Sequence, residues 1–498
     1  MDTDARARPV ETERCALCIV GAGLAGLNAL FVAARYLAPG DRVILVDQRD
    51  RVGGMWHTTY DHVRLHQPHR VFTAGNIPWQ LAAPAAYRAD RAEILAHFDR
   101  CLAELRGRVT LTERFAHTYQ GHDEVEVDGR HEAHVRLRPR DPGAPDRLIR
   151  ARRLIKAFGF DVRPLAPLPL SSARVRSIAP ESPDFLGGAM QHDDAPIYVV
   201  GGGKTGTDAA HHAIERYPGR RVELIVGRGK AFLDRSKLFP EGPARYLGGT
   251  LILDMMRDLA LRYDGDNDDA VFAYFLDRYG LALDGPAHAC LFGLISPDEI
   301  AAIDRGAARI TPAYLEDVVD DGDTPVMVYR DGRREPIEPG SWIVNCTGHL
   351  LRDARPHEPC VSPHGTTLSI QQTAAITFVT SFGAYFLTHL WLMGKLPGVP
   401  LWVMNHEALD RASSRSYLMA ASTQLVYNIM QIIDAVPPRV ILDCGINFDN
   451  WYPLYRVLWI VAKLKARKRA YLPHLEATLR RIEERHGIRG EFLPTATI

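Results

Sequence analysis

The sequence has no excess of charge of either sign, because 60 Lys and Arg side chains balance 60 Asp and Glu side chains in 498 residues. Such a balance creates no net field that would favour nucleic acid or an acidic partner. Residues 1–14 are polar and charged without an apolar core, which argues against a signal peptide. The length predicts two domains, or one domain with large insertions.

Cysteine is scarce, and metal-binding patterns are missing. The seven cysteines are scattered and odd in number, which favours a cytoplasmic protein over a disulfide scaffold. Cys15 and Cys18 form a C-x-x-C pair, but they fall on an expected strand and are interpreted as ordinary strand residues. No His/Cys cluster has metal-ligand spacing, and the acidic run 264–269 lacks the glutamate of a calcium loop. We expect no metal.

Long hydrophobic runs are also few. Residues 374–394 contain no acidic or basic residue, yet they carry several hydroxyl side chains and His389. We expect a strand, a turn at Gly383 and a buried helix that includes His389, rather than a membrane span. The tail from Trp451 is predicted to be a packed helix with a solvated basic face over 463–469. Docking of that face on a membrane surface is the open alternative.

A glycine-rich turn lies near the N-terminus. An apolar strand over 16–20 leads into Gly21, Gly23 and Gly26, and an apolar helix is expected over 24–37. Gly21 permits the tight turn, and Gly23 lets the backbone approach a pyrophosphate at the helix N-terminus. Gly26 allows close packing of helix on strand. This order of strand, glycine turn and helix predicts a dinucleotide site rather than a packing turn.

The residues after this turn carry a family resemblance. A second strand over 42–46 ends in Asp47, whose carboxylate can accept hydrogen bonds from both ribose hydroxyls, and Gly53-Gly54 and Trp56 follow in "DQRDRVGGMW". This register resembles the class B flavoprotein monooxygenases, the flavin-containing monooxygenases and amine N-hydroxylases, as a divergent member. The resemblance implies that the first turn binds FAD and that the paired glycines approach the flavin.

A second fingerprint repeats the pattern. The strand 197–200 precedes Gly201, Gly203 and Gly206, and a helix is expected over 207–217. Two such turns in one chain are typical of enzymes that pass electrons from a nicotinamide to a flavin.

The second site carries a basic residue where the first carries an acid. Gly227-Arg228 follows the strand 221–226, and a guanidinium can bind a phosphate through two hydrogen bonds, which predicts NADPH over NADH. A solvated strand end is the alternative for Arg228. Thr205 before the third glycine, and Asp208 after it, also resemble the family's second fingerprint.

The expected fold class is α/β, with two Rossmann-like dinucleotide-binding domains. Strands at 152–161 and 341–350 resemble those that end the two nucleotide segments, so an NADPH domain (190–340) is inserted into an FAD domain formed by 1–165 and 341–498. Residues 232–310 are predicted as a helical insertion that covers the active site, and the C-terminal region is helical. In the related proteins a turn such as that at Gly383 aims a helix N-terminus at the flavin.

The loop 60–79 is the expected catalytic segment. The related proteins carry an amide here beside the flavin, and we assign that role to Gln67 together with His66; a purely structural loop is the alternative.

The resemblance implies an enzyme that takes hydride from NADPH, forms a flavin C4a-peroxide with O2 and transfers one oxygen atom to a small molecule. The family's linker histidine is missing from 171–185, which weakens a Baeyer–Villiger assignment and favours N-oxygenation of an amine or amino acid.

Several alternatives stay open: S-oxygenation or Baeyer–Villiger oxidation, NADPH–flavin oxidation without oxygen insertion, and a non-catalytic redox sensor. A disulfide reductase needs a cysteine pair beside the flavin, which the position of Cys15 and Cys18 cannot provide. A homo-oligomer is compatible with the sequence.

Overall fold

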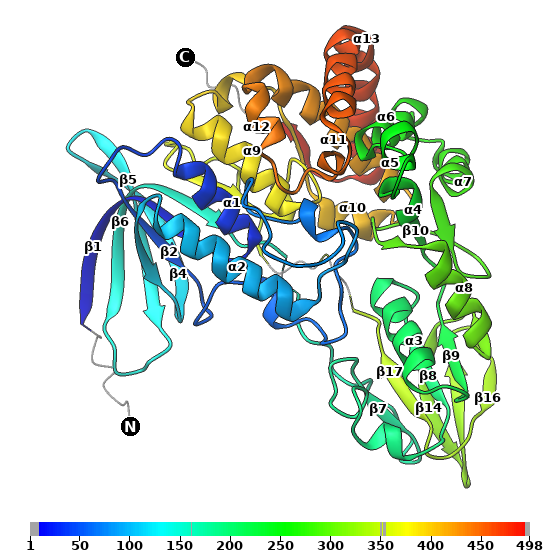
Figure 1. The fold of residues 1–498 in the computed structure, drawn as a ribbon. Helices are drawn as coiled ribbons and strands as arrows, with labels where there is room; N and C mark the ends of the chain where they lie inside the picture. Colours follow the sequence, from blue (N-terminus) through cyan, green and yellow to red (C-terminus); the bar gives the residue numbers. More distant parts are fainter. Residues whose placement is uncertain (1–8, 161, 349–350, 352–354, 494–498) are drawn as a thin grey trace.

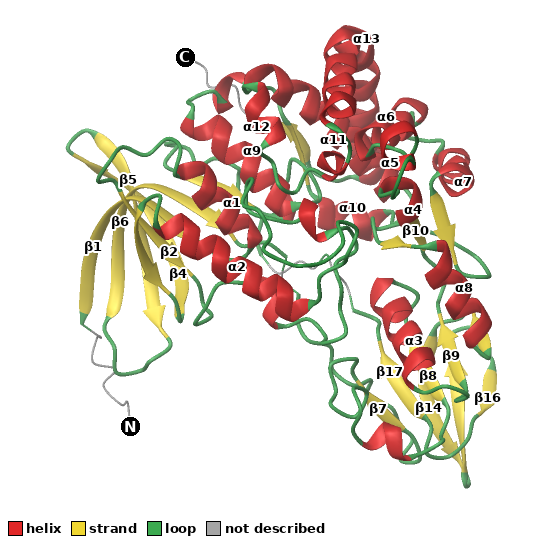
Figure 2. Cartoon of the chain, viewed as in Figure 1, coloured by secondary structure: helices red, strands yellow, loops and turns green. Residues whose placement is uncertain are grey.

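The computed structural model describes residues 9–160, 162–348, 351 and 355–493, and this part of the chain contains two large sheets and three small ones, with helices packed around them (Figure 1). Figure 2 shows the division into a strand-rich unit that includes the N-terminus, a helical region that includes most of the C-terminal part, and a second, smaller α/β unit. The predicted α/β class is confirmed. Residue 161 and residues 349–350, which end two of the expected strands, lie outside the described part of the chain.

The first sheet has the order β3-β2-β1-β6-β5-β4, and β18 pairs with β6. Its members are β1 (Val10–Val20), β2 (Arg42–Val46), β3 (Thr110–Arg114), β4 (His117–Val127), β5 (Arg130–Pro139), β6 (Asp146–Ala157) and β18 (Thr367–Ile370). Strands β3, β2, β1, β6 and β18 are parallel, whereas β4 and β5 pair antiparallel. Helix α1 (Leu24–Ala33) is buried along its whole length between this sheet and α9 (Thr380–Leu392).

The second sheet is wholly parallel, with the order β13-β9-β8-β17-β7. Its strands are β7 (Arg176–Ile178), β8 (Ile197–Val200), β9 (Val222–Ile225), β13 (Arg309–Thr311) and β17 (Trp342–Asn345), and α3 (Lys204–Arg216) packs against it. Strand β17 therefore belongs to the second sheet, and β18 is the strand that returns to the first. The second unit extends over 176–345 rather than the expected 190–340, because β7 and β17 pair with each other.

The expected helical insertion is present within 231–306. It contains β10 (Ala231–Asp234), α4 (Arg235–Leu238), α5 (Ala244–Leu247), α6 (Ile252–Arg262), α7 (Asp268–Arg278), β11 (Gly280–Ala282), β12 (Leu294–Ile295) and α8 (Pro297–Gly306). Helix α6 packs against α11 (Tyr417–Ala435) and α13 (Leu454–His486), so the insertion joins the C-terminal helices in one layer. Helices α10 (His406–Ala412) and α12 (Pro438–Leu442) complete that region.

The hydrophobic run 374–394 differs from the expectation. A short 3-10 turn, Gln372–Ala374, replaces the strand, and α9 continues through Gly383, whose amide donates to the Val379 carbonyl at 3.0 Å. Gly383 has no positive φ, so it marks no turn; the helix begins three residues earlier, at Thr380. His389 is buried as predicted, and its Nδ1 lies 2.7 Å from the Tyr36 hydroxyl. Within the described ranges, no helix is both long and apolar enough to cross a membrane.

Candidate active site

The first glycine turn connects β1 to α1. Gly21 has φ +110°, which favours glycine, and its amide donates to the Val46 carbonyl at 2.8 Å. A Cβ on Gly26 would lie 1.8 Å from the Gly21 oxygen, so only glycine allows the helix to start this close to the strand. Gly26 therefore serves packing, as the sequence predicted.

The paired glycines reach this turn from the other side. Gly53 donates its amide to the Ala22 carbonyl at 3.0 Å, and a Cβ on Gly54 would lie 2.9 Å from the Cα of Gly23. Gly53 and Gly54 have φ values of +138° and +57°. The two loops thus approach each other through bare backbone.

Asp47 follows β2 and is 6% exposed. Its Oδ2 accepts the Ala22 amide at 2.7 Å, and its Oδ1 accepts the Arg49 amide at 2.8 Å. Each carboxylate oxygen can accept a second hydrogen bond. Asp47 therefore fixes the turn and retains acceptor capacity for ribose hydroxyls.

The second glycine turn repeats the first. Gly201 has φ +132°, and a Cβ on Gly206 would lie 1.8 Å from the Gly201 oxygen, the same approach as in the first turn. Gly203 differs, because a Cβ placed there would meet no atom within 4 Å. The backbone at Gly203, which precedes α3, faces open space beside a helix N-terminus.

Both turns line one cavity of about 1860 Å³. All but three of the predicted site residues line it: Gly21, Gly23, Asp47, Gly53, Gly54, Trp56, His66, Gln67, Gly201, Gly203, Thr205 and Arg228. The exceptions are Gly26 and Gly206, which pack helix on strand, and Gly383, which is enclosed in α9. At the start of that helix Thr380 and Ser381 line the cavity instead.

Cations gather at the end of the cavity beside β9. Arg228 is exposed and Lys230 is half-buried, and both line the cavity. Burial lowers the pKa of His288, and the charges of Arg228, Arg415 and Lys230 lower it further. Such a cluster can bind a phosphate group at this end.

His66 and Gln67 lie on the loop between the two units. Burial lowers the pKa of His66 to about 3, and the charge of Lys204 adds to this shift, so the ring is neutral near pH 7. The His66 carbonyl accepts the Arg235 Nε at 2.7 Å, and Arg235 pairs with Glu299 at 2.7 Å. Gln67 is 6% exposed, and its amide makes no hydrogen bond to the part of the protein that the structure describes.

A partly buried cluster that the sequence did not predict joins the two units. The Tyr60 hydroxyl donates to Asp208 at 2.8 Å, and Lys204 pairs with the other oxygen of Asp208. Burial alone would raise the pKa of Asp208, but Lys204 and the Tyr60 hydroxyl outweigh it and hold that pKa below its ordinary value. The only sequence signal was the family-like position of Asp208; the partner Tyr60 is 148 residues away.

None of the seven cysteines, all of them in described segments, forms a disulfide. Cys15 and Cys18 are buried in β1, and burial raises the pKa of Cys15 to about 12. Cys346 lines the cavity, but it is the only cysteine that does so among the described lining residues. The cavity therefore holds no dithiol pair.

Comparison with known proteins gives a family match over the first part of the chain. Residues 16–237 match the model of the pyridine nucleotide-disulphide oxidoreductase family. No curated protein matches the sequence significantly.

Several solved structures are similar at low identity. Bacillithiol disulfide reductase from Staphylococcus aureus is 11% identical, with a TM-score of 0.46 over 78% of this chain and 99% of that one. A flavin-containing monooxygenase from Stenotrophomonas maltophilia is 16% identical, with a TM-score of 0.44 over 77% and 98%. The ornithine N-hydroxylase of Kutzneria sp. 744 is 12% identical, with a TM-score of 0.47 over 77% and 99%. The part of the chain that holds both glycine turns is therefore similar, over residues 16–237, to the pyridine nucleotide-disulphide oxidoreductases.

Proposed function

We propose that this protein is an FAD-dependent, NADPH-using monooxygenase that adds one oxygen atom from O2 to a small molecule. The observation that supports the proposal most strongly is that two glycine turns, built alike, line one cavity. Electron transfer between two nucleotides requires such a shared space. The family match over residues 16–237 supports the same class of enzyme.

The first turn suits FAD. Bare backbone at Gly23 and Gly54 lets the two loops approach each other closely, and the amides at the start of α1, which have no partner within the helix, can bind a pyrophosphate. Asp47 would accept the ribose hydroxyls, and Trp56 lies half-buried on the same cavity wall.

The second turn suits NADPH. The open space at Gly203 admits a pyrophosphate to the N-terminus of α3, and no acid follows β9 to bind an unmodified ribose. Arg228 and Lys230 would bind the 2′-phosphate that distinguishes NADPH from NADH.

When bound, the nicotinamide supplies hydride and the flavin carries electrons to O2. The chain binds and orients these groups. His66 is neutral near pH 7, so its ring exchanges hydrogen bonds rather than donating a proton as a cation. Gln67 offers an amide on the same wall, which is the role that we propose for it.

Within this class we propose N-oxygenation of an amine. A buried site disfavours an ammonium ion and favours the neutral amine, whose lone pair is the required nucleophile. NADPH oxidation without oxygen transfer is the second candidate. Disulfide reduction is disfavoured, because the described cavity wall carries Cys346 without a second cysteine.

The test is to purify the protein, record its visible spectrum and measure NADPH consumption with amines, amino acids, sulfides and ketones under labelled O2. We expect a yellow protein and a product that has gained one labelled oxygen atom. Hydrogen peroxide as the sole oxygen product would favour the second candidate. A colourless protein that takes up neither cofactor would refute both.

A further inference from the structure

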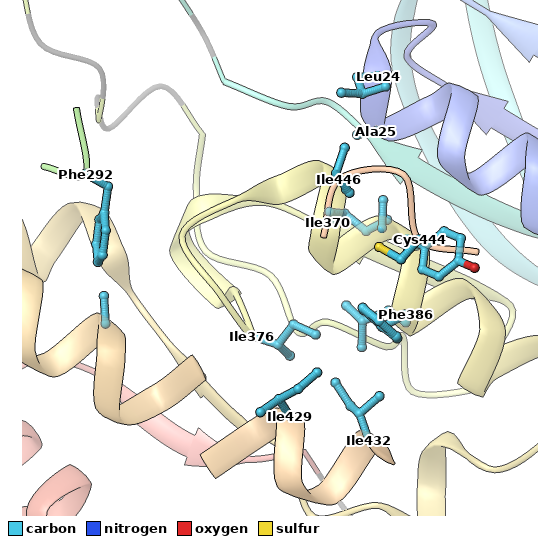
Figure 3. Close-up of a cluster of buried hydrophobic side chains, with 14 of the residues drawn as sticks. Leu24, Ala25, Phe292, Ile370, Ile376, Phe386, Ile429, Ile432, Cys444 and Ile446 are labelled. Carbon is cyan, nitrogen blue, oxygen red and sulfur yellow. The ribbon is translucent and has the colours of Figure 1, made fainter. Parts of the chain in front are cut away.

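The cavity extends away from the glycine turns into a space between helices, which we call the apolar arm. Its wall includes Met256 of α6, Phe386 of α9, Ile429 and Ile433 of α11, and Ile460 and Val461 of α13. Figure 3 shows Phe386 and Ile429 in this region, together with Leu24 at the start of α1. These side chains come from three helices of the C-terminal region and from α6 of the insertion.

The wall that α11 contributes is apolar because the polar groups of this helix bond elsewhere. Leu425, Ile429 and Ile433, which line the cavity, are four residues apart and form one stripe. Gln424 donates to the carbonyls of Ala375 and Trp402, and Asn428 donates to those of Ile376 and Trp402. The stripe therefore offers a ligand only hydrocarbon.

A carboxylate at the start of α6, that of Asp449, is also engaged. Asp449 is 2% exposed, and it accepts the amides of Ile252 at 2.6 Å and Leu253 at 3.2 Å, which caps α6. A charged substrate group gains little here, because the oxygens of Asp449 already serve the helix.

Protein interiors rarely leave apolar surface without contacts, since an empty space forfeits dispersion energy. Binding sites are the common exception: they are concave, mostly apolar and largely formed before the ligand arrives. We propose that the apolar arm binds an extended hydrocarbon part of the substrate, so that the substrate is a lipophilic amine rather than an amino acid. This inference rests on the proposed function for the reacting group, but binding in the arm can be measured without turnover.

The test uses N,N-dimethylalkylamines from butyl to dodecyl, below the concentrations at which they form micelles. Binding to the flavin-loaded protein is measured by calorimetry, and NADPH oxidation is measured in parallel. Affinity should rise about three- to fourfold per added methylene until the arm is filled. Affinity that does not depend on chain length would overturn the proposal, whether or not the protein oxidises NADPH. If affinity rises with chain length but no amine is oxygenated, the proposed function is wrong, whereas binding of a hydrocarbon chain in the arm is still supported.

Two pairs of variants test whether the amines bind in the apolar arm. Val461→Trp should fill the arm and weaken binding of N,N-dimethyldodecylamine at least tenfold while leaving binding of the butyl compound unchanged. Ala462→Trp, at an exposed position on the same helix, is the control and should change neither. Ile429→Ala and Ile432→Ala form a second pair, because both are buried in α11 but only Ile429 lines the cavity. If both variants of either pair change the affinity for the long-chain amine equally, the amine does not bind in the apolar arm.

A different observation concerns the outer surface of α13. Leu454, Tyr455, Leu458 and Trp459 are exposed on its first two turns, next to exposed Tyr246 and Leu247 of α5; we call these six residues the docking face. The Tyr455 hydroxyl donates to the Tyr246 carbonyl at 2.6 Å, so the two helices are adjacent. Leu247 is 89% exposed, and Trp459 is 58% exposed. Exposed apolar groups gathered in this way mark an interaction surface.

The charge beside the docking face indicates its partner. From Leu454 to Leu475 the helix carries six Lys and Arg residues and no Asp or Glu. Asp254 and Asp434 neutralise part of this charge through Lys463, Lys465 and Lys468. A second copy of the chain would bring like charges together, whereas Trp, Tyr and Leu beside cations suit an anionic lipid surface. We infer that the docking face binds the surface of an anionic membrane.

The test is co-sedimentation with phosphatidylcholine vesicles, with and without phosphatidylserine. We expect binding only to the vesicles that contain phosphatidylserine, and loss of that binding at high salt. Leu458→Ser combined with Trp459→Ser should abolish it, whereas Val10→Ser, at an exposed residue of β1, should not. Protein that stays in the supernatant with both vesicles would overturn the inference. So would a dimer in solution that the double substitution converts to a monomer.

Discussion

Replacing Gly203 by alanine separates nucleotide binding from folding at the second turn. Gly203 has φ −85° and ψ −173°, which alanine adopts readily, and its added Cβ would meet no atom within 4 Å. The free energy of unfolding should therefore change by no more than about 0.5 kcal/mol. The methyl group would instead occupy the space through which a pyrophosphate approaches the N-terminus of α3.

The cost to NADPH binding follows from the lost contacts. One hydrogen bond from a backbone amide to a charged phosphate is worth about 1.5–3 kcal/mol. Losing it should raise the Kd of NADPH about ten- to hundredfold. Calorimetric titration with NADPH measures this change, and urea unfolding checks that stability is unchanged.

Gly206→Ala is the matched control. Its Cβ would lie 1.8 Å from the Gly201 oxygen, a backbone atom that cannot move without opening the turn. This variant should lose stability as well as binding. If Gly203→Ala binds NADPH like the unchanged protein, the second turn is not the nicotinamide nucleotide site.

Three further predictions concern other residues. Arg228→Ala should raise the KM for NADPH at least tenfold and leave the KM for NADH unchanged. An equal rise for both nucleotides would show that Arg228 does not bind the 2′-phosphate. Gln67→Leu should keep NADPH oxidation but divert electrons to hydrogen peroxide, measured as the ratio of peroxide to product, and an unchanged ratio would contradict its role. Burial lowers the pKa of His97 to about 3 and that of His406 to about 4, so both are neutral in the fold. Their contribution to the free energy of unfolding is complete above pH 6.5. It should be lost as the pH falls toward these pKa values, by up to about 1.4 kcal/mol per pH unit for each histidine. Urea unfolding at several pH values should show a smaller loss of stability at acid pH in His406→Gln than in the unchanged protein.

Local pattern was sufficient to predict both glycine turns. Strand, glycines and helix follow one another within a few residues, and the close contacts of Gly26 and Gly206 are of the kind that this spacing implies. Segment 60–79 was also predicted as part of the site, and His66 and Gln67 line the cavity.

Pairing between distant segments was not predictable from pattern. The strand predicted over 341–350 was assigned to the FAD domain, but a short apolar strand does not encode its neighbour, and β17 pairs with β8 and β7 of the second sheet. Gly383 was interpreted as a turn, although the surrounding residues continue the helix through it. The Tyr60–Asp208 contact and the apolar arm depend on tertiary packing across more than a hundred residues.

We propose that the two turns hold different nucleotides across one cavity, close enough for electrons to pass. The most direct test is to mix the purified, flavin-loaded protein with NADPH in the absence of oxygen and to follow the visible absorbance of the flavin. We expect rapid bleaching of the unchanged protein, and slower bleaching of Gly203→Ala at low NADPH. A bound flavin that NADPH leaves oxidised would contradict it.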